Sequence, residues 1–255
     1  MATPPPISPP IATPLSTPAP VPEDRSRVAP VWHTVVFIVV TLALTGYQAH
    51  AQPKIETLQL RNRGPLYLVM IAFELLMLLY VWLGVRSTGT KVRGIVGGKW
   101  KSFADFWVDA AVAMGFWVVV VGLLIAMSLM LGKNSAGTEA VKALLPRTYT
   151  EMVMWVCLST TAGFCEEFIF RGYLQRQFLA LTGKPALAVV FQALIFGAAH
   201  LYQGWKGAVT ITVYGALFGV LAVWRKSLRP GMMQHAVQDT VSGLIGSYAL
   251  RHHVF

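Results

Sequence analysis

About seven stretches of roughly 20 apolar residues run through this chain, and they constrain its fold more than any other feature. They cover residues 31–47, 65–85, 106–131, 151–170, 185–203, 207–224 and 232–250. An apolar helix of about 20 residues spans the hydrocarbon core of a bilayer. The sequence therefore predicts an all-α fold, a polytopic bundle of about seven transmembrane helices. The count rises to eight if the 106–131 segment or the C-terminal tail contains a break.

The composition supports a membrane protein. Charged residues make up 13% of the chain and hydrophobic residues 55%, whereas soluble domains carry about 25% charged residues. The lipid bilayer is thus the first partner that the sequence predicts.

The N-terminus has a different composition. Ten of the first thirty residues are proline, interleaved with Ser, Thr and Ala. Such a segment cannot form a packed core, so we expect residues 1–29 to be a disordered, polyproline-like tail. It lacks the basic start and directly following apolar core of a signal peptide. The tail is either a solvated tether or a docking segment for a partner, and residues 30–145 form a first group of transmembrane helices.

The net charge of +10 does not indicate nucleic-acid binding, because the basic residues lie in loops between the apolar stretches. Their positions indicate how the chain is oriented in the membrane. The loops at residues 86–101 and 225–229 fall on the same side as the N-terminus if the helices alternate in direction. Lys and Arg number about 12 on that side and about 8 on the other. By the positive-inside rule the N-terminus is predicted to be cytoplasmic.

The spacing of the two cysteines indicates that they are packing residues. Cys157 and Cys165 are eight residues apart on one predicted helix. Neither a CxxC spacing nor a nearby histidine pairing indicates a zinc site or a disulfide. We therefore expect both side chains to act as small apolar groups.

Two glutamates stand side by side inside an apolar stretch, with an arginine four residues after the second. An ionisable side chain in a membrane helix costs roughly 2.5–3.5 kcal/mol, so a functional site is the default interpretation. On an α-helix Glu167 and Arg171 are i,i+4 neighbours and can form an ion pair. Glu166 points about 100° away, because an α-helix has about 3.6 residues per turn. We expect Glu166 to face a cavity and to stay chemically available.

A histidine at the end of the next apolar stretch is the second candidate. His200 lies one turn after Phe196, and alone it is typical of a membrane-interface residue. The turn at residues 182–185 joins two predicted helices, and Glu166 and His200 lie symmetrically about residue 183. An antiparallel hairpin would bring the carboxylate and the imidazole level, where they can share a water or a metal ion.

The last apolar stretch supplies a third pair. His235 and Asp239 are i,i+4 and so lie on one face, where they can also simply bond to each other. Four acidic residues are expected inside the membrane, and three of them join these clusters. The fourth, Glu74, has no partner that the sequence identifies. We expect it to make either a structural polar contact or a contact with a substrate.

Two chemistries fit these residues, and both end in hydrolysis of an amide. Glu166, His200 and His235 could bind Zn²⁺ as a His₂Glu set, with an activated water in the open fourth position. Alternatively, Glu166 and His200 activate a water without metal, and His235 helps to stabilise the oxyanion.

In order and spacing the three motifs resemble the CPBP or Abi family of intramembrane proteases, which process CAAX proteins or bacteriocins and include the type II CAAX prenyl endopeptidase. The motifs are EExxxR, FxxxH and HxxxN/D, here Glu166, Glu167 and Arg171, then Phe196 and His200, then His235 and Asp239. The resemblance covers about residues 150–245 and nothing before them. It implies that residues 146–255 are a catalytic transmembrane core.

The resemblance also implies roles. Glu166 would be the water-activating base and His200 its partner, while His235 and Asp239 would line the oxyanion side. Glu167, Arg171 and Phe196 would support them. The family has been described with both metal-dependent and metal-free glutamate mechanisms, so zinc and its absence both remain open.

One departure concerns Asp239, which stands where the prenyl endopeptidase has asparagine. An ionised aspartate cannot donate a hydrogen bond to an oxyanion. Asp239 must be protonated, orient His235 or bind a metal.

The expected protein is a multi-pass membrane endopeptidase acting on a membrane-associated protein or peptide, lipidated or bacteriocin-like, in a bacterial inner membrane. Two alternatives stay open. A scaffold or regulator could keep the fold without proteolysis, and intramembrane Glu and His residues also mark proton or ion transporters.

One geometric conflict follows from the predicted helices. His235 lies a few residues into the last helix, whereas Glu166 is about 27 Å along its helix from the turn near residue 184. Either the helix of Glu166 projects beyond the bilayer, or the loop at residues 225–231 is drawn inward.

Overall fold

The computed structural model describes residues 26–252, apart from residues 57–61 and 133. Within these residues the chain forms helices and connecting loops and no strand, which confirms the all-α prediction. In chain order the elements are α1 (Val31–Glu56), α2 (Gly64–Ser87), α3 (Val92–Val96), α4 (Phe103–Leu131), α5 (Ser135–Leu144), α6 (Tyr149–Glu166), the π-helix η2 (Glu167–Leu174), α7 (Gln175–Thr182), α8 (Pro185–Ala198), the 3₁₀-helix η3 (Leu201–Gln203), α9 (Gly204–Arg225) and α10 (Arg229–Arg251).

Each of the seven predicted segments is helical, and five helices in the described residues are long and apolar enough to cross a membrane. These are Val31–Gln48, Gly64–Ser87, Phe103–Leu131, Tyr149–Thr182 and Leu201–Arg225. The predicted 185–203 segment is a shorter helix of 14 residues. The predicted 232–250 segment lies in α10, which has 23 residues but several polar ones on its first turns. The 106–131 segment contains no break, since α4 is continuous. The chain is thus a polytopic helical membrane protein.

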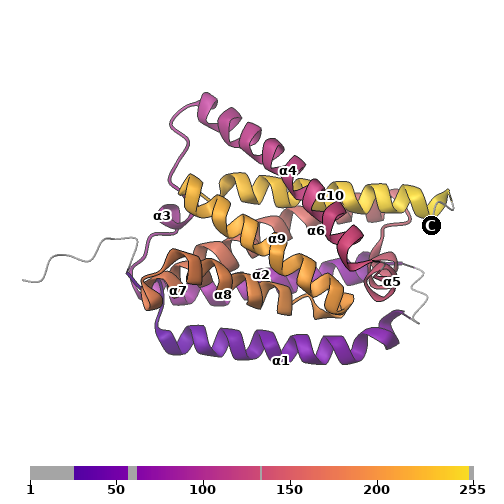
Figure 1. Cartoon of the computed structure of the whole chain (residues 1–255), viewed down its shortest axis with the longest axis horizontal. Coiled ribbons are helices and arrows are strands. Elements are labelled where there is room, and N and C mark those ends of the chain that lie inside the picture. The colour runs from indigo at the N-terminus through magenta and orange to yellow at the C-terminus, as the bar shows by residue number, and fades with distance from the viewer. Residues whose placement is uncertain (1–25, 57–61, 133, 253–255) are drawn as a thin grey trace, which may run out of the picture.

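The helices form an elongated bundle in which α1 lies along one edge and α4 runs obliquely from the opposite edge across α10 (Figure 1). Close approach of α6 and α10 depends on small residues. A Cβ added to Gly163 of α6 would lie 2.7 Å from the backbone nitrogen of Ala236 in α10. The indole of Trp155 packs against Gly243 and donates a hydrogen bond to the carbonyl of Asp239, at 3.0 Å.

A buried glutamate fixes the beginning of α6 beside the beginning of α2. Thr148 caps α6 by accepting a hydrogen bond from the backbone N–H of Glu151. The Glu151 carboxylate accepts from the N–H of Arg147 at 2.7 Å and, across the bundle, from the N–H of Arg63 at 2.8 Å. These bonds satisfy backbone donors that a helix start otherwise leaves unpaired, and they set the register of α2 against α6.

The predicted disordered tail lies outside the described residues up to residue 25. Residues 28 and 29, at the end of the expected tail, pack in the bundle. Val28 and Ala29 are buried. The side-chain amide of Gln177 in α7 accepts hydrogen bonds from both of their N–H groups and donates to the carbonyl of Ala29. Because these backbone groups have hydrogen-bond partners in Gln177, the backbone of residues 28 and 29 can be buried.

Candidate active site

The EExxxR segment lies at a change of helix type. Glu166 ends α6, and residues 167–174 form the π-helix η2, in which every residue is buried. The α-helical geometry assumed from the sequence is therefore wrong beyond Glu166. Gly172 allows this wider turn to pack, because a Cβ there would lie 2.7 Å from Ile95 and 3.0 Å from Leu228. π-helical turns are rare and occur frequently at functional sites.

The predicted ion pair between Glu167 and Arg171 is confirmed. Arg171 Nη1 lies 3.0 Å from Glu167 Oε1, and the two side chains are 0% and 1% exposed. Arg171 Nη2 donates to the carbonyl of Gly215 in α9 at 3.1 Å. The guanidinium also lies over the rings of Phe196 and Phe218, 4.4 and 5.1 Å from their centroids. Phe196 thus contacts the arginine directly, and the arginine ties η2 to α8 and α9.

His235 lies between three carboxylates. Its Nδ1 is 3.1 Å from Glu167 Oε1, and its Nε2 is 3.6 Å from both Glu166 Oε2 and Asp239 Oδ2. A Glu167 carboxylate paired with Arg171 accepts a hydrogen bond, so Nδ1 carries the proton of this contact. Nε2 then faces two further carboxyl groups, and this arrangement is attractive only if a proton is shared among the three side chains.

Exposure increases outward across this cluster. The side chain of His235 is 5% exposed, that of Glu166 15% and that of Asp239 38%. At 3.6 Å the contact between His235 and Asp239 is too long for a direct hydrogen bond. The exposed fraction of Glu166 is thus intermediate between that of the buried histidine and that of the more open aspartate.

Aromatic rings fix the orientation of the buried imidazole. The rings of Phe196, Tyr214 and Phe218 lie edge-on or nearly so to His235, with centroids 6.3, 5.8 and 5.6 Å away. With Nδ1 held by Glu167 and the ring packed on these sides, His235 has one orientation. Tyr214 and Phe218, both in α9, were not identified from the sequence, because apolar and aromatic residues fill every helix of a membrane protein.

His200 follows the end of α8 and points from the turn before η3. Its Nδ1 is 2.8 Å from the carbonyl of Phe196. A carbonyl only accepts, so Nδ1 carries a proton in this contact. In the described part of the chain His200 forms no ion pair with Glu166, and so the hairpin expected from the sequence does not bring the two into direct contact.

The three residues predicted to bind Zn²⁺ do not form a metal site as they stand. Among the residues that the structure describes, no group of three or more His, Cys, Asp and Glu side chains is close enough to hold a metal ion. Glu166, His200 and His235 therefore do not fit a closed set of zinc ligands in this conformation.

The structure explains how Glu166 and His235, which the sequence placed at different depths, come to the same level. The corner between α7 and α8 lies beyond the N-terminal end of α10 along the bundle axis (Figure 1). The continuous helix that carries Glu166, Tyr149–Thr182, has 34 residues and extends past the start of α10. Glu166 and His235 thereby come level.

A second buried ionic cluster was missed. Asp109 in α4 is 2% exposed. It accepts from Trp100 Nε1 at 2.8 Å and pairs with Arg225 Nη2 at 3.2 Å and Arg229 Nε at 2.9 Å. The sequence analysis did not identify Asp109, although this residue lies inside the 106–131 stretch. This cluster fixes the first turn of α10, six residues before His235.

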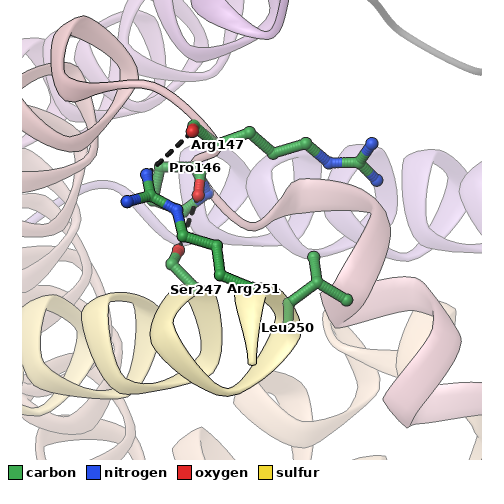
Figure 2. A pocket seen from close by; sticks show the side chains of 5 residues that line it. All are labelled: Pro146, Arg147, Ser247, Leu250 and Arg251. Atoms are coloured by element: carbon green, nitrogen blue, oxygen red, sulfur yellow. Dashed lines mark hydrogen bonds between the residues drawn. The ribbon is translucent and has the colours of Figure 1, made fainter. Parts of the chain in front are cut away.

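Two cavities of about 280 Å³ lie away from the cluster around His235. One lies where the end of α10 meets the chain before α6, and Figure 2 shows Ser247 bonded to the carbonyl of Pro146 and Arg251 bonded to that of Arg147. These bonds make it a structural junction. The other is apolar and lies between α2, α3 and the α6–η2 helix.

Carboxylates and imidazoles gathered between the helices of a membrane bundle are groups that an intramembrane hydrolase would use. Residues 148–241 match the family model described as type II CAAX prenyl endopeptidase Rce1-like. The matched residues contain all three motifs, so the match confirms the resemblance found from the motifs. No curated protein matches the chain, and no solved structure does.

Proposed function

We propose that this protein is an endopeptidase that hydrolyses a peptide bond of a membrane-associated protein or peptide, using a water activated by Glu166. The observation that carries the proposal is the position of Glu166. Its carboxylate lies 3.6 Å from a buried imidazole and is three times as exposed, 15% against 5%. It can meet water and a substrate, with Nε2 of His235 beside it.

In the proposed reaction Glu166 acts as the general base. The water oxygen forms a bond to the carbonyl carbon of the scissile amide as one of its O–H bonds breaks, and the proton passes to Glu166. The carbonyl π-electrons move to oxygen and give a tetrahedral oxyanion. When the C–N bond breaks, Glu166 returns the proton to the leaving amine, so atoms and charges balance.

His235 supplies the oxyanion contact. With Nδ1–H bound to Glu167, a proton on Nε2 makes the ring an imidazolium, which two nearby carboxyl groups stabilise. Nε2–H can then donate to the developing oxyanion. Asp239 balances the imidazolium in this scheme and does not donate itself. Arg171 acts by holding Glu167, and Glu167 by holding His235.

His200 is proposed to orient the water. The Phe196 carbonyl keeps the proton on Nδ1, so Nε2 can accept the second hydrogen of the water while Glu166 accepts the first. A change in the α8–η3 turn would bring His200 to the same water. Since the described residues form no zinc site, no step is assigned to a metal.

The topology belongs to the same proposal. We propose a multi-pass protein of a bacterial inner membrane, with a cytoplasmic N-terminus and substrates that approach from the bilayer or its cytoplasmic face. The basic loops at residues 86–101 and 225–229 support this orientation.

The test compares protein N- and C-termini, by mass spectrometry, in cells that express the wild type or Glu166→Gln at equal levels. New termini should form with the wild type and be absent with the variant. The matched control is Glu139→Gln in α5, an exposed glutamate paired with Lys142, which should keep every cleavage. Metal analysis of the purified wild type shows whether zinc accompanies activity.

Identical termini in the wild type and Glu166→Gln would refute proteolysis. In that case the scaffold alternative predicts that Glu166→Gln still complements a deletion of the gene. The transporter alternative predicts that the same change abolishes a proton or ion flux.

A further inference from the structure

Helix α2 runs beside α6 in the same direction. At its beginning, a Cβ on Gly64 would lie 3.2 Å from the sulfur of Met154. One turn later the ring of Tyr67 lies 5.7 Å from that of Trp155. Further along, residues 75–79 of α2 and residues 164–168 of the α6–η2 helix line the same apolar cavity. Residue numbers therefore rise together along the two helices.

This register places residue 74 beside the end of α6. It lies between the pair of residues 67 and 155 and the shared cavity at residues 75–79 and 164–168. Residue 74 is therefore level with the last turn of α6, which ends at Glu166.

Glu74 also lies on the inward face of α2. Positions 67, 74, 78, 81 and 85 follow the spacing of one helix face, and on this face Tyr67, Val81 and Val85 are fully buried. Glu74 itself is partly buried. It is thus directed into the bundle and not toward lipid.

The charges around Glu74 are those of the active site. Electrostatic interactions join it to Glu166, His235 and Asp239. Within the described residues it forms neither a hydrogen bond nor an ion pair. An ionisable residue with no hydrogen-bond or ion-pair partner among the described residues, in a helix apolar enough to cross a membrane, is costly and marks a functional position.

We propose that Glu74 is a substrate-binding residue that hydrogen-bonds the backbone of the substrate beside the scissile bond. A peptide must be extended to reach Glu166, and in a membrane its freed N–H groups then lack partners. The carboxyl group of Glu74 supplies an acceptor at that depth. This inference rests on the proposed protease function. It also extends the site to α2, which lies outside the matched residues 148–241.

The test measures steady-state kinetics of purified Glu74→Leu and Glu74→Gln in detergent. The probe is a fluorescence-quenched peptide with the sequence around a cleavage site found by the terminus comparison. Leu has a similar size without hydrogen-bonding groups, so kcat/KM should fall about 10- to 100-fold, mainly through KM. Gln keeps an acceptor and should stay within about threefold of the wild type.

Thermal stability separates binding from a structural role. Leucine suits a membrane helix better than glutamate, so the melting temperature of Glu74→Leu should equal or exceed that of the wild type. Three results would overturn the inference: unchanged kcat/KM in Glu74→Leu, equal losses in Leu and Gln variants, or a lowered melting temperature of the Leu variant. If Glu166→Gln abolishes cleavage while both Glu74 variants cleave normally, only this inference fails and the proposed function stands.

Discussion

The buried pair of Glu167 and Arg171 gives a quantitative prediction. Glu167→Gln keeps the shape of the side chain but leaves a guanidinium that is 0% exposed without its counter-ion. Breaking a buried pair by removing one partner costs about 3–5 kcal/mol. For a chain of this length, about 2–4 °C per kcal/mol gives a fall in melting temperature of about 6–20 °C.

Removing both charges should cost much less than the two single changes together. In Glu167→Gln/Arg171→Met no buried charge remains unpaired, and methionine fills the space between Phe196 and Phe218. We therefore expect the double-mutant cycle to give a coupling free energy of about 3 kcal/mol. Cleavage should still be lost in Glu167→Gln and in the double variant, because His235 loses the carboxylate that holds its Nδ1–H.

The assay heats detergent-solubilised protein and measures the monodisperse fraction that remains. The control is the exposed pair of Glu139 and Lys142, 3.1 Å apart with side chains 59% and 27% exposed. A surface pair of this kind contributes about 0–1 kcal/mol at most, so Glu139→Gln should hardly shift the melting temperature. If the Glu167 and Arg171 changes add to within about 0.5 kcal/mol, the two charges are independent and the reasoning is refuted.

Two further predictions concern how α10 is held. Asp109→Ala leaves Arg225 at the end of α9 and Arg229 at the start of α10 without their shared carboxylate, so it should lower stability by about 1–3 kcal/mol and slow cleavage; an unchanged melting temperature would contradict the role of this cluster. Gly163→Val places side-chain atoms where a Cβ already lies 2.7 Å from the nitrogen of Ala236, and such overpacking costs about 1–3 kcal/mol. Cleavage should fall because α6 and α10 separate, whereas the control Gly115→Ala, whose Cβ meets nothing within 4 Å, should be neutral or stabilising.

The ion pair between Glu167 and Arg171 is a contact that the local sequence pattern could predict. Glu167 and Arg171 are four residues apart, so their pairing needs only helical spacing and was predicted correctly. The π-helix that contains them was not, because the wider turn depends on Ile95 and Leu228 packing against Gly172. Those residues are distant in sequence, and local propensity does not predict that they pack against Gly172.

Contacts between helices were predicted less well. The symmetry about residue 183 suggested that Glu166 and His200 meet, but the side chain that lies 3.6 Å from Glu166 is that of His235, from α10. A helical hairpin fixes depth and leaves rotation about each helix axis undetermined. That rotation depends on packing at Gly163 and Gly243, where only a missing side chain lets α6 approach α10.

The sequence by itself determined that the chain spans a membrane as helices. It also determined which ionisable residues within the apolar helices are expected to have a functional or structural role. Both conclusions rest on transfer free energies that depend on residue type and not on neighbours. Only the tertiary structure decided that Asp109 fastens α10, that Glu167 holds His235 and that Glu74 lies level with Glu166. These relations join helices far apart in sequence, and they follow from close packing, which a linear pattern of apolar and charged residues does not encode.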